Sequence, residues 1–215
     1  MAKKTKEIVL ESIEKKGRFY LLTFSNGFEF KASPATRDRL ALSEGMKYDP
    51  DQFERLRSEL EKRFAYDTAE STLASRSYSV GEFREKLRQK GLARRYIDAI
   101  IGEYHSRNLL DDYRYAAMKL QTLMEHKPAG RSYLIAYLQS KRVSREIAEK
   151  AVDEVLLHTS EVDIASRLLA KRRVSFMKFD VETARRKAYN YLSRRGISYR
   201  AAKEAFENLF LRPKD

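Results

Sequence analysis

The sequence contains no cysteine, which excludes a disulfide framework and a thiolate metal site and gives no argument for an oxidising compartment. No stretch approaches the run of about 18 uncharged apolar residues that a membrane span requires. The basic start Met1–Lys6 leads into a strand-like run rather than into the apolar core of a signal peptide. These absences predict a cytoplasmic protein that does not enter a membrane.

Signatures of catalysis are also missing. The 8 glycines are scattered, and no glycine-rich loop of the kind that cradles phosphate is present. His105, His126 and His158 fall at the ends of helices in different parts of the chain, without metal-ligand spacing, and the acidic pair Asp111-Asp112 is explained by its place at a helix start. The sequence therefore predicts a protein that is not an enzyme and that holds no metal or other cofactor.

Positive charge is in excess. Lys and Arg number 44 against 31 Asp and Glu, so the formal net charge is +13. The net charge is +1 over residues 1–75, +5 over 76–158 and +7 over 159–215. An excess of this size favours a polyanion or an acidic protein surface as partner, and its distribution places that contact in the second and third parts of the chain.

A pattern in the segment Ser79–Ala117 recurs 51 residues later and again after a further 54. Each copy has two apolar residues one helical turn apart, then a short basic turn, then a second apolar stripe at helical spacing. The apolar positions are Phe83, Leu87, Tyr96, Ile97, Ile100, Ile101 and Tyr104 in the first copy, Leu134, Leu138, Ile147, Ala148, Ala151, Val152 and Val155 in the second, and Ala188, Leu192, Ala201, Ala202, Ala205, Phe206 and Leu209 in the third. A repeat protein follows from this period.

The first 63 residues differ from the rest. Alternating apolar residues and the pair Asn26-Gly27 predict a β-hairpin with strands near 8–10, 19–24 and 28–30. Ser33-Pro34 predicts the start of a helix that ends near Gly45, and Asp49-Pro50 predicts the start of another that runs to Phe64.

From Phe64 onward each repeat is expected to have three helices. The leading helices are predicted at about 64–76, 112–126 and 161–173, Ser144 and Ser198 are expected to cap the third helices, and the loop 174–180 is expected to hold the extra residues of the third repeat. The fold class is thus mainly α, with three tandem three-helix repeats after a small β-hairpin and helix module. The predicted domains are 1–63, 64–111, 112–159 and 160–215.

Basic residues gather at the turn between the second and third helices of each repeat. Any one of them is more simply explained as solvating an exposed helix face, but their recurrence at equivalent turns favours a binding stripe for nucleic acid or for an acidic protein. The candidate binding residues are Arg84, Lys86, Arg88, Lys90, Arg94, Arg95, Lys141, Arg142, Arg145, Arg185, Arg186, Lys187, Arg194, Arg195 and Arg200.

Tyrosines lie beside these turns, and stacking on unpaired bases is the less common of their two roles, since most tyrosines at helical spacing belong to the core boundary. They are Tyr133, Tyr137, Tyr189, Tyr191 and Tyr199. Residues 82–104 also have the pattern of a helix-turn-helix, so a DNA-binding transcription factor or a non-specific nucleic-acid binder is the alternative function. That pattern is weak, because any helical repeat contains a two-helix hairpin.

Several motifs, in this order and spacing, resemble those of the bacterial RecX regulators. They are Leu87–Leu92, Leu110–Ala116, Lys127–Gly130 leading into Leu138–Val143, and Leu192–Ile197. The resemblance covers about residues 64–210. Arg142 departs from it, since the family usually has a glycine at that position of the turn, and only some members have the N-terminal hairpin.

The resemblance implies an elongated, curved molecule that lies in the groove of the filament that the RecA recombinase forms on single-stranded DNA. It implies inhibition of filament growth, ATP hydrolysis and strand exchange in recombination and DNA repair, without chemistry by the modulator. The expected partners are the RecA filament, single-stranded DNA and, further, duplex DNA, with the protein itself a monomer.

Overall fold

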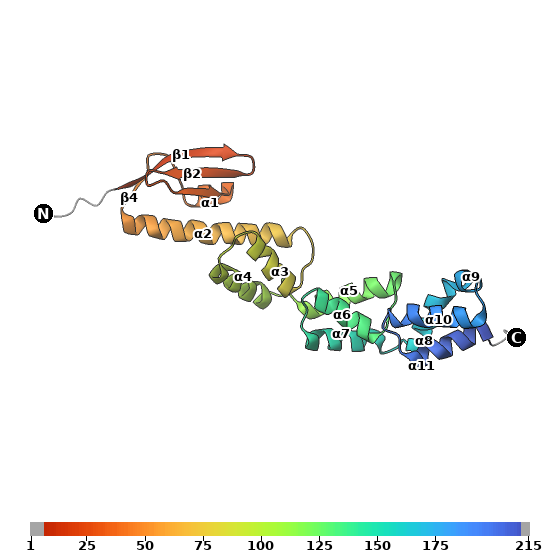
Figure 1. Ribbon diagram of the computed structural model, residues 1–215. Helices are drawn as coiled ribbons and strands as arrows, with labels where there is room; N and C mark the ends of the chain where they lie inside the picture. Colours follow the sequence, from red (N-terminus) through yellow and green to blue (C-terminus); the bar gives the residue numbers. More distant parts are fainter. Residues whose placement is uncertain (1–6, 212–215) are drawn as a thin grey trace. The chain divides into compact units, whose positions relative to one another are not determined.

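The computed structural model describes residues 7–211, so the basic segment Met1–Lys6 lies outside it. The described residues form two compact units. One contains the residues up to Ser77 together with Arg84–Ser106, and the other contains Tyr78–Phe83 and the residues from Arg107 onward. The prediction of a mainly helical fold with a small N-terminal β module is confirmed (Figure 1).

The N-terminal sheet has four antiparallel strands in the order β3-β2-β1-β4. They are β1 (Ile8–Lys16), β2 (Phe19–Phe24), β3 (Glu29–Ala32) and β4 (Lys47–Tyr48). Gly27 has a φ of +84° in the tight turn between β2 and β3, as the Asn-Gly pair predicts. The two-residue strand β4 was not predicted, because it is too short to show an alternating pattern.

The sheet packs on the long helix α2 (Pro50–Leu73). The ring of Phe24 on β2 lies 5.1 Å from that of Phe53 on α2, edge to face. Asp49 and Gln52 form a reciprocal capping box at the start of this helix. The expectation of a separate helix from about residue 64 is wrong, since α2 is continuous there. Residues 54–73 contain neither glycine nor proline, so nothing breaks the helix.

Three other helices belong wholly or partly to the first unit: α1 (Pro34–Arg39), α3 (Val80–Gln89) and α4 (Arg94–Ser106). Helix α1 ends at Arg39 rather than near Gly45 as predicted, because Ala41 turns to a φ of +47°. The limits 1–63, 64–111, 112–159 and 160–215 remain predictions.

After α4, the described residues form three helices in the predicted second repeat, and four helices with a final π turn in the predicted third repeat. They are α5 (Asp112–His126), α6 (Arg131–Ser140), α7 (Arg145–Leu156), α8 (Glu161–Ala170), α9 (Arg173–Phe176), α10 (Val181–Ser193), α11 (Tyr199–Phe206) and η1 (Glu207–Leu211). Helix α8 is shorter than expected, and the short helix α9 begins the segment that was predicted to be a loop. Ser144 and Ser198 cap α7 and α11 as predicted.

The predicted apolar stripes form the core. The pairs that begin each stripe, such as Phe83 and Leu87, are fully buried in all three copies. Burial of one such side chain contributes about 1.5–3 kcal/mol for a leucine or phenylalanine. Only Tyr96, Ile147, Val155 and Leu209 are half-buried, at the edge of the stripes.

Candidate nucleic-acid interface

The predicted basic turns share one backbone geometry. After α3, the N–H of Leu92 donates to the carbonyl of Leu87 (3.3 Å) and the N–H of Gly91 donates to the carbonyl of Arg88 (3.0 Å). This pair of bonds is the Schellman motif that ends a helix with one residue in the left-handed region. The same two bonds join Val143 to Leu138 and Arg142 to Gln139, and then Ile197 to Leu192 and Gly196 to Ser193.

The left-handed residue is Gly91 (φ +82°), Arg142 (φ +59°) and Gly196 (φ +71°) in the three turns. Arg142 therefore adopts the conformation that glycine adopts in the other two copies, although its Cβ makes that conformation costly by about 1–2 kcal/mol. The departure from the glycine pattern changes the strain of the turn and leaves its shape intact.

Two of these turns dock on the preceding repeat inside the second unit. Ser79, just before α3, donates its hydroxyl to the carbonyl of Lys141, and the N–H of Gly130, just before α6, donates to the carbonyl of Arg195 (2.8 Å). A helix N-terminus carries unpaired N–H groups and a partial positive charge, so it suits the free carbonyls of a turn. The backbone at Lys141 and Arg195 is thus structural, while the two side chains stay available for binding.

Around the first turn, carboxylates hold most of the predicted cations. Arg84 and Arg94 (3.5 Å) both pair with Asp98, and Arg88 pairs with Glu85 (2.8 Å). The hydrogen bond from Arg84 holds the pKa of Asp98 below its usual value. Lys86 and Lys90 are exposed and make no ion pair within residues 7–211.

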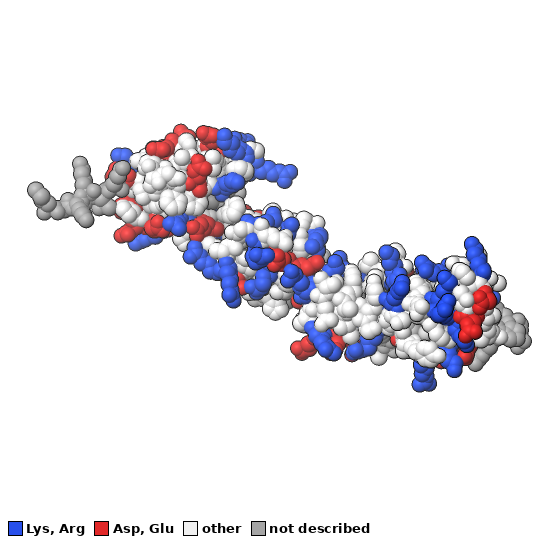
Figure 2. All heavy atoms as spheres, viewed as in Figure 1, with Lys and Arg blue, Asp and Glu red and all other residues white. Residues whose placement is uncertain are grey.

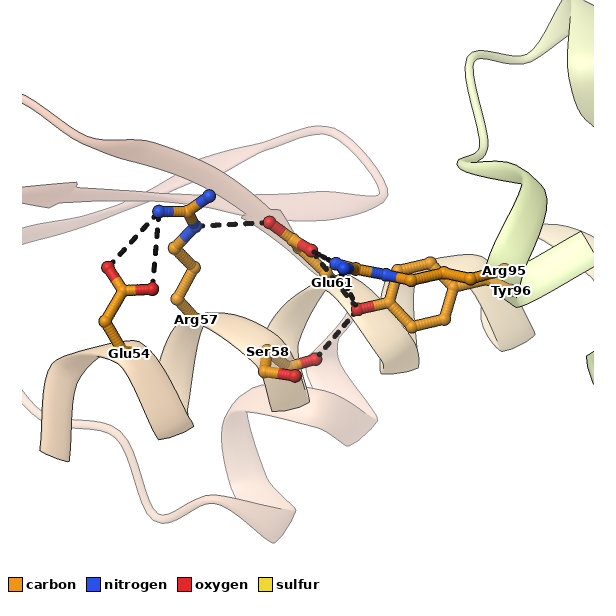
Figure 3. A network of polar contacts seen from close by, with 6 residues as sticks. All are labelled: Glu54, Arg57, Ser58, Glu61, Arg95 and Tyr96. Carbon is orange, nitrogen blue, oxygen red and sulfur yellow. Dashed lines mark hydrogen bonds and ion pairs between the residues drawn. The ribbon is translucent and has the colours of Figure 1, made fainter. Parts of the chain in front are cut away.

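Arg95 belongs to a polar network between α2 and α4 (Figure 3). Its guanidinium lies 2.6 Å from the carboxylate of Glu61, which also accepts from Arg57 and from the hydroxyl of Tyr96. A phosphate that binds Arg95 must therefore compete with Glu61. This residue is better explained by its role in joining the two helices than by nucleic-acid binding.

In the second and third repeats, aromatic rings replace carboxylates as neighbours of several cations. Lys141 lies over Tyr137 (5.8 Å), Lys187 over Phe179 (4.4 Å), and Arg195 over both Tyr133 (5.8 Å) and Tyr191 (6.0 Å). A ring orients a cation without neutralising its charge. The charge of these three side chains therefore remains available to a phosphate.

The other predicted cations of these repeats divide into two groups. Arg145 pairs with Glu149 (2.8 Å) and Arg185 pairs with Glu182 (3.3 Å). The exposed side chains without an ion pair in the described part of the chain are Arg142, Arg186, Arg194 and Arg200. Figure 2 shows blue side chains over the α8–α11 region with few red ones, in contrast to the mixed colours over the N-terminal sheet and α2.

One basic residue in this region was not predicted from the sequence. The guanidinium of Arg172 lies over the ring of Tyr191 at 4.5 Å, so this ring has close cations from two segments, Arg172 and Arg195. Arg172 precedes α9, outside the recurring turn on which the prediction was based. In the sequence, only the spacing of four residues between Tyr191 and Arg195 could have indicated that a cation lies beside this ring.

Within residues 7–211, no group of three or more histidine or acidic side chains is placed to hold a metal ion. In that same range, no helix has the length and apolar character needed to cross a bilayer.

Comparisons with known proteins give consistent results. A family described as "RecX, second three-helix domain" matches residues 111–152, which contain α5, α6 and most of α7. The Regulatory protein RecX of Syntrophotalea carbinolica is 32% identical over 138 residues, covering 62% of this chain and 88% of the relative. That of Streptococcus uberis is 25% identical over 200 residues, covering 93% of this chain and 76% of the relative.

Two solved structures share the fold. A crystal structure of regulatory protein RecX aligns with a TM-score of 0.64 at 17% identity, over 92% of this chain and 98% of that one. The crystal structure of RecX from Lactobacillus salivarius aligns with a TM-score of 0.62 at 22% identity, over 71% of this chain and 98% of that one.

Proposed function

The chain belongs to the RecX family of regulatory proteins, and from this premise we propose that it modulates, and mainly inhibits, the RecA recombinase. In this proposal it binds in the groove of the RecA filament on single-stranded DNA and restrains filament growth, ATP hydrolysis and strand exchange. It performs no catalysis of its own. The proposal includes duplex DNA as a further partner, a monomeric protein and a cytoplasmic location.

The recurrence of one turn geometry carries the proposal. Three Schellman turns present cations, and each turn is braced by a buried apolar residue: Leu92, Val143 or Ile197. Repeated binding points on one chain add their contributions when they meet a repeating partner, because the second contact forms at high effective concentration. A nucleoprotein filament is such a partner, and its phosphates and acidic side chains attract the same cations.

The ion pairs count against the alternative of a helix-turn-helix transcription factor. In residues 82–104 the second helix is α4, and its first turn would have to read base edges in the major groove. Arg94 pairs with Asp98 there, and Arg95 pairs with Glu61. Two of the side chains best placed to meet bases are thus held by carboxylates, which repel phosphate.

The test is the DNA-dependent ATPase of RecA, measured with increasing amounts of this protein at near-physiological salt. Its binding to the same single-stranded DNA without RecA is measured in parallel by fluorescence anisotropy. Inhibition is expected at protein concentrations far below those that coat the naked DNA.

Two results would contradict the proposal. One is a protein that neither binds RecA filaments nor changes their ATPase. The other is inhibition that appears only when the naked DNA is coated, which would identify a generic basic binder of nucleic acid.

A further inference from the structure

A cavity of about 650 Å³ lies between α10 and α11 of the second unit. One wall is a single face of α10, because Arg186, Tyr189, Asn190 and Ser193 follow one another at helical spacings of three, one and three residues. Tyr199, the first residue of α11, contributes to the opposite wall. The proposed function gives this cavity no role.

Tyr199 is 69% exposed, which makes it the most exposed of the phenylalanines and tyrosines in residues 7–211. One side of the ring is nevertheless packed. It lies edge to face against Tyr189, with ring centroids 5.3 Å apart and planes at 84°. Tyr189 in turn lies edge to face against Phe206 at 6.0 Å, and Phe206 is fully buried.

Three rings therefore lead from the core to the surface, and the contact with Tyr189 orients the outermost. A rigid exposed ring loses little entropy when a flat apolar group stacks on it. Stacking of a nucleobase on such a ring is sequence-tolerant, because every base has a π face.

The polar groups of the cavity suit the rest of a nucleotide. Arg186 is exposed and makes no ion pair with any described residue, so it is available to a phosphate, whereas Arg185 pairs with Glu182 at the cavity edge. Asn190 has both a hydrogen-bond donor and an acceptor for the edge of a base. The aliphatic chain of a lipid would offer these polar side chains no hydrogen-bond partner.

We propose that the cavity between α10 and α11 is a binding site for one unpaired nucleotide of a single strand, with the base stacked on Tyr199 and its phosphate at Arg186. The choice of a strand over a free nucleotide rests on the proposed function. The exposed cations Arg194 and Arg200, which flank the Ser198 cap of α11, can extend the contact to neighbouring phosphates.

The test uses the full chain and two oligonucleotides of the same length, one of thymidylate and one of abasic sites, which keeps the phosphates and lacks the bases. Binding is followed by fluorescence anisotropy for the wild type, Tyr199→Ala, Tyr199→Phe and Arg186→Ala. Phe64→Ala is the control, since Phe64 on α2 is an exposed ring outside the cavity. Circular dichroism checks that each variant is folded.

Tyr199→Ala should weaken binding of the thymidylate strand by about 5- to 150-fold, the range of one lost stacking contact. It should leave binding of the abasic strand unaffected, while Tyr199→Phe and Phe64→Ala should bind both strands like the wild type. Arg186→Ala should weaken binding of both strands. It should also make the dependence of log K on log salt concentration less steep by about 0.7.

If Tyr199→Ala lost equal affinity for the two strands, or lost affinity for neither, the assignment would be overturned. It would also be overturned if thymidine monophosphate competed as well per nucleotide as the strand, because the site would then take free nucleotides. Wild-type inhibition of the RecA ATPase would still stand in each of these cases, so a failure here is distinguishable from a failure of the proposed function.

Discussion

Gly81 and Arg142 lie so close that a Cβ placed on Gly81 would come within 2.5 Å of the Cβ of Arg142 and 2.7 Å of its carbonyl oxygen. Gly81 is the second residue of α3, and Arg142 is the left-handed residue of the second basic turn. The contact thus requires glycine on one side, and on the other side it fixes a turn that carries candidate binding residues.

Gly81→Ala should lower the free energy of unfolding by about 1–3 kcal/mol, because the new methyl group meets backbone that can yield only by moving the turn. Urea unfolding followed by circular dichroism measures this change. Gly102→Ala is the control, since a Cβ there meets nothing within 4 Å in the interior of α4, and it should stabilise by up to about 1 kcal/mol. Equal effects of the two substitutions would show that the contact is unimportant.

Arg142→Gly should raise the free energy of unfolding by up to about 1 kcal/mol, since glycine adopts a φ of +59° without the steric cost of a Cβ. Gly91→Ala, at φ +82° in the equivalent first turn, should lower the free energy of unfolding. The urea midpoints, at an unchanged m-value, report both effects. A lower midpoint for Arg142→Gly would mean that the arginine side chain itself stabilises the turn.

Arg194→Glu should weaken binding to single-stranded DNA roughly tenfold and leave helical content unchanged, because this exposed side chain makes no ion pair in the described residues. Arg88→Glu should have a smaller effect, since Glu85 already pairs with Arg88 at 2.8 Å. Anisotropy titrations at several salt concentrations compare the two variants. A larger loss of affinity for Arg88→Glu than for Arg194→Glu would mean that the first turn contributes more to binding than the third.

Asp98→Asn should tighten binding to single-stranded DNA, because it removes the carboxylate that both Arg84 and Arg94 contact. Each additional phosphate bound should steepen the dependence of log K on log salt by about 0.7. The same titrations measure this slope. An unchanged affinity and slope would place the first turn outside the nucleic-acid interface.

Asp180 caps α10 by accepting from the N–H of Thr183 (2.9 Å), and this bond lowers the pKa of Asp180. A lowered folded-state pKa contributes stability above the unfolded value of about 3.9, and this contribution is lost as the pH falls through the folded value. Asp180→Asn keeps a capping oxygen without a titrating group. The stability of the wild type should therefore fall further than that of Asp180→Asn between about pH 6 and pH 3 in urea unfolding.

Much of the fold could be predicted because its signals are local. The stripes begun by Phe83 and Leu87 indicated the helices and their buried faces, and Ser144 and Ser198 marked helix starts by their capping chemistry. The errors have local causes too. No glycine or proline marked a limit inside α2, and α9 is a four-residue helix in a segment without apolar periodicity.

The candidate site could be predicted in part. The basic residues could be identified along the chain, but nothing in their spacing separated Arg95, which Glu61 holds, from Arg195, which lies over Tyr133 and Tyr191. The neighbours Glu61 and Tyr133 come from other helices, at sequence distances over which no local pattern extends. Arg172 was missed for the same reason.

The sequence by itself determined the repeat, the helical core, the excess of positive charge and the family, because each depends on the order and spacing of residues along the chain. Only the tertiary structure decided which cations face carboxylates and which face rings, that Arg142 adopts the turn of a glycine, and that Tyr199 packs against Tyr189 at the wall of a cavity. These features depend on distances between segments, and such distances are set by packing after the helices have formed.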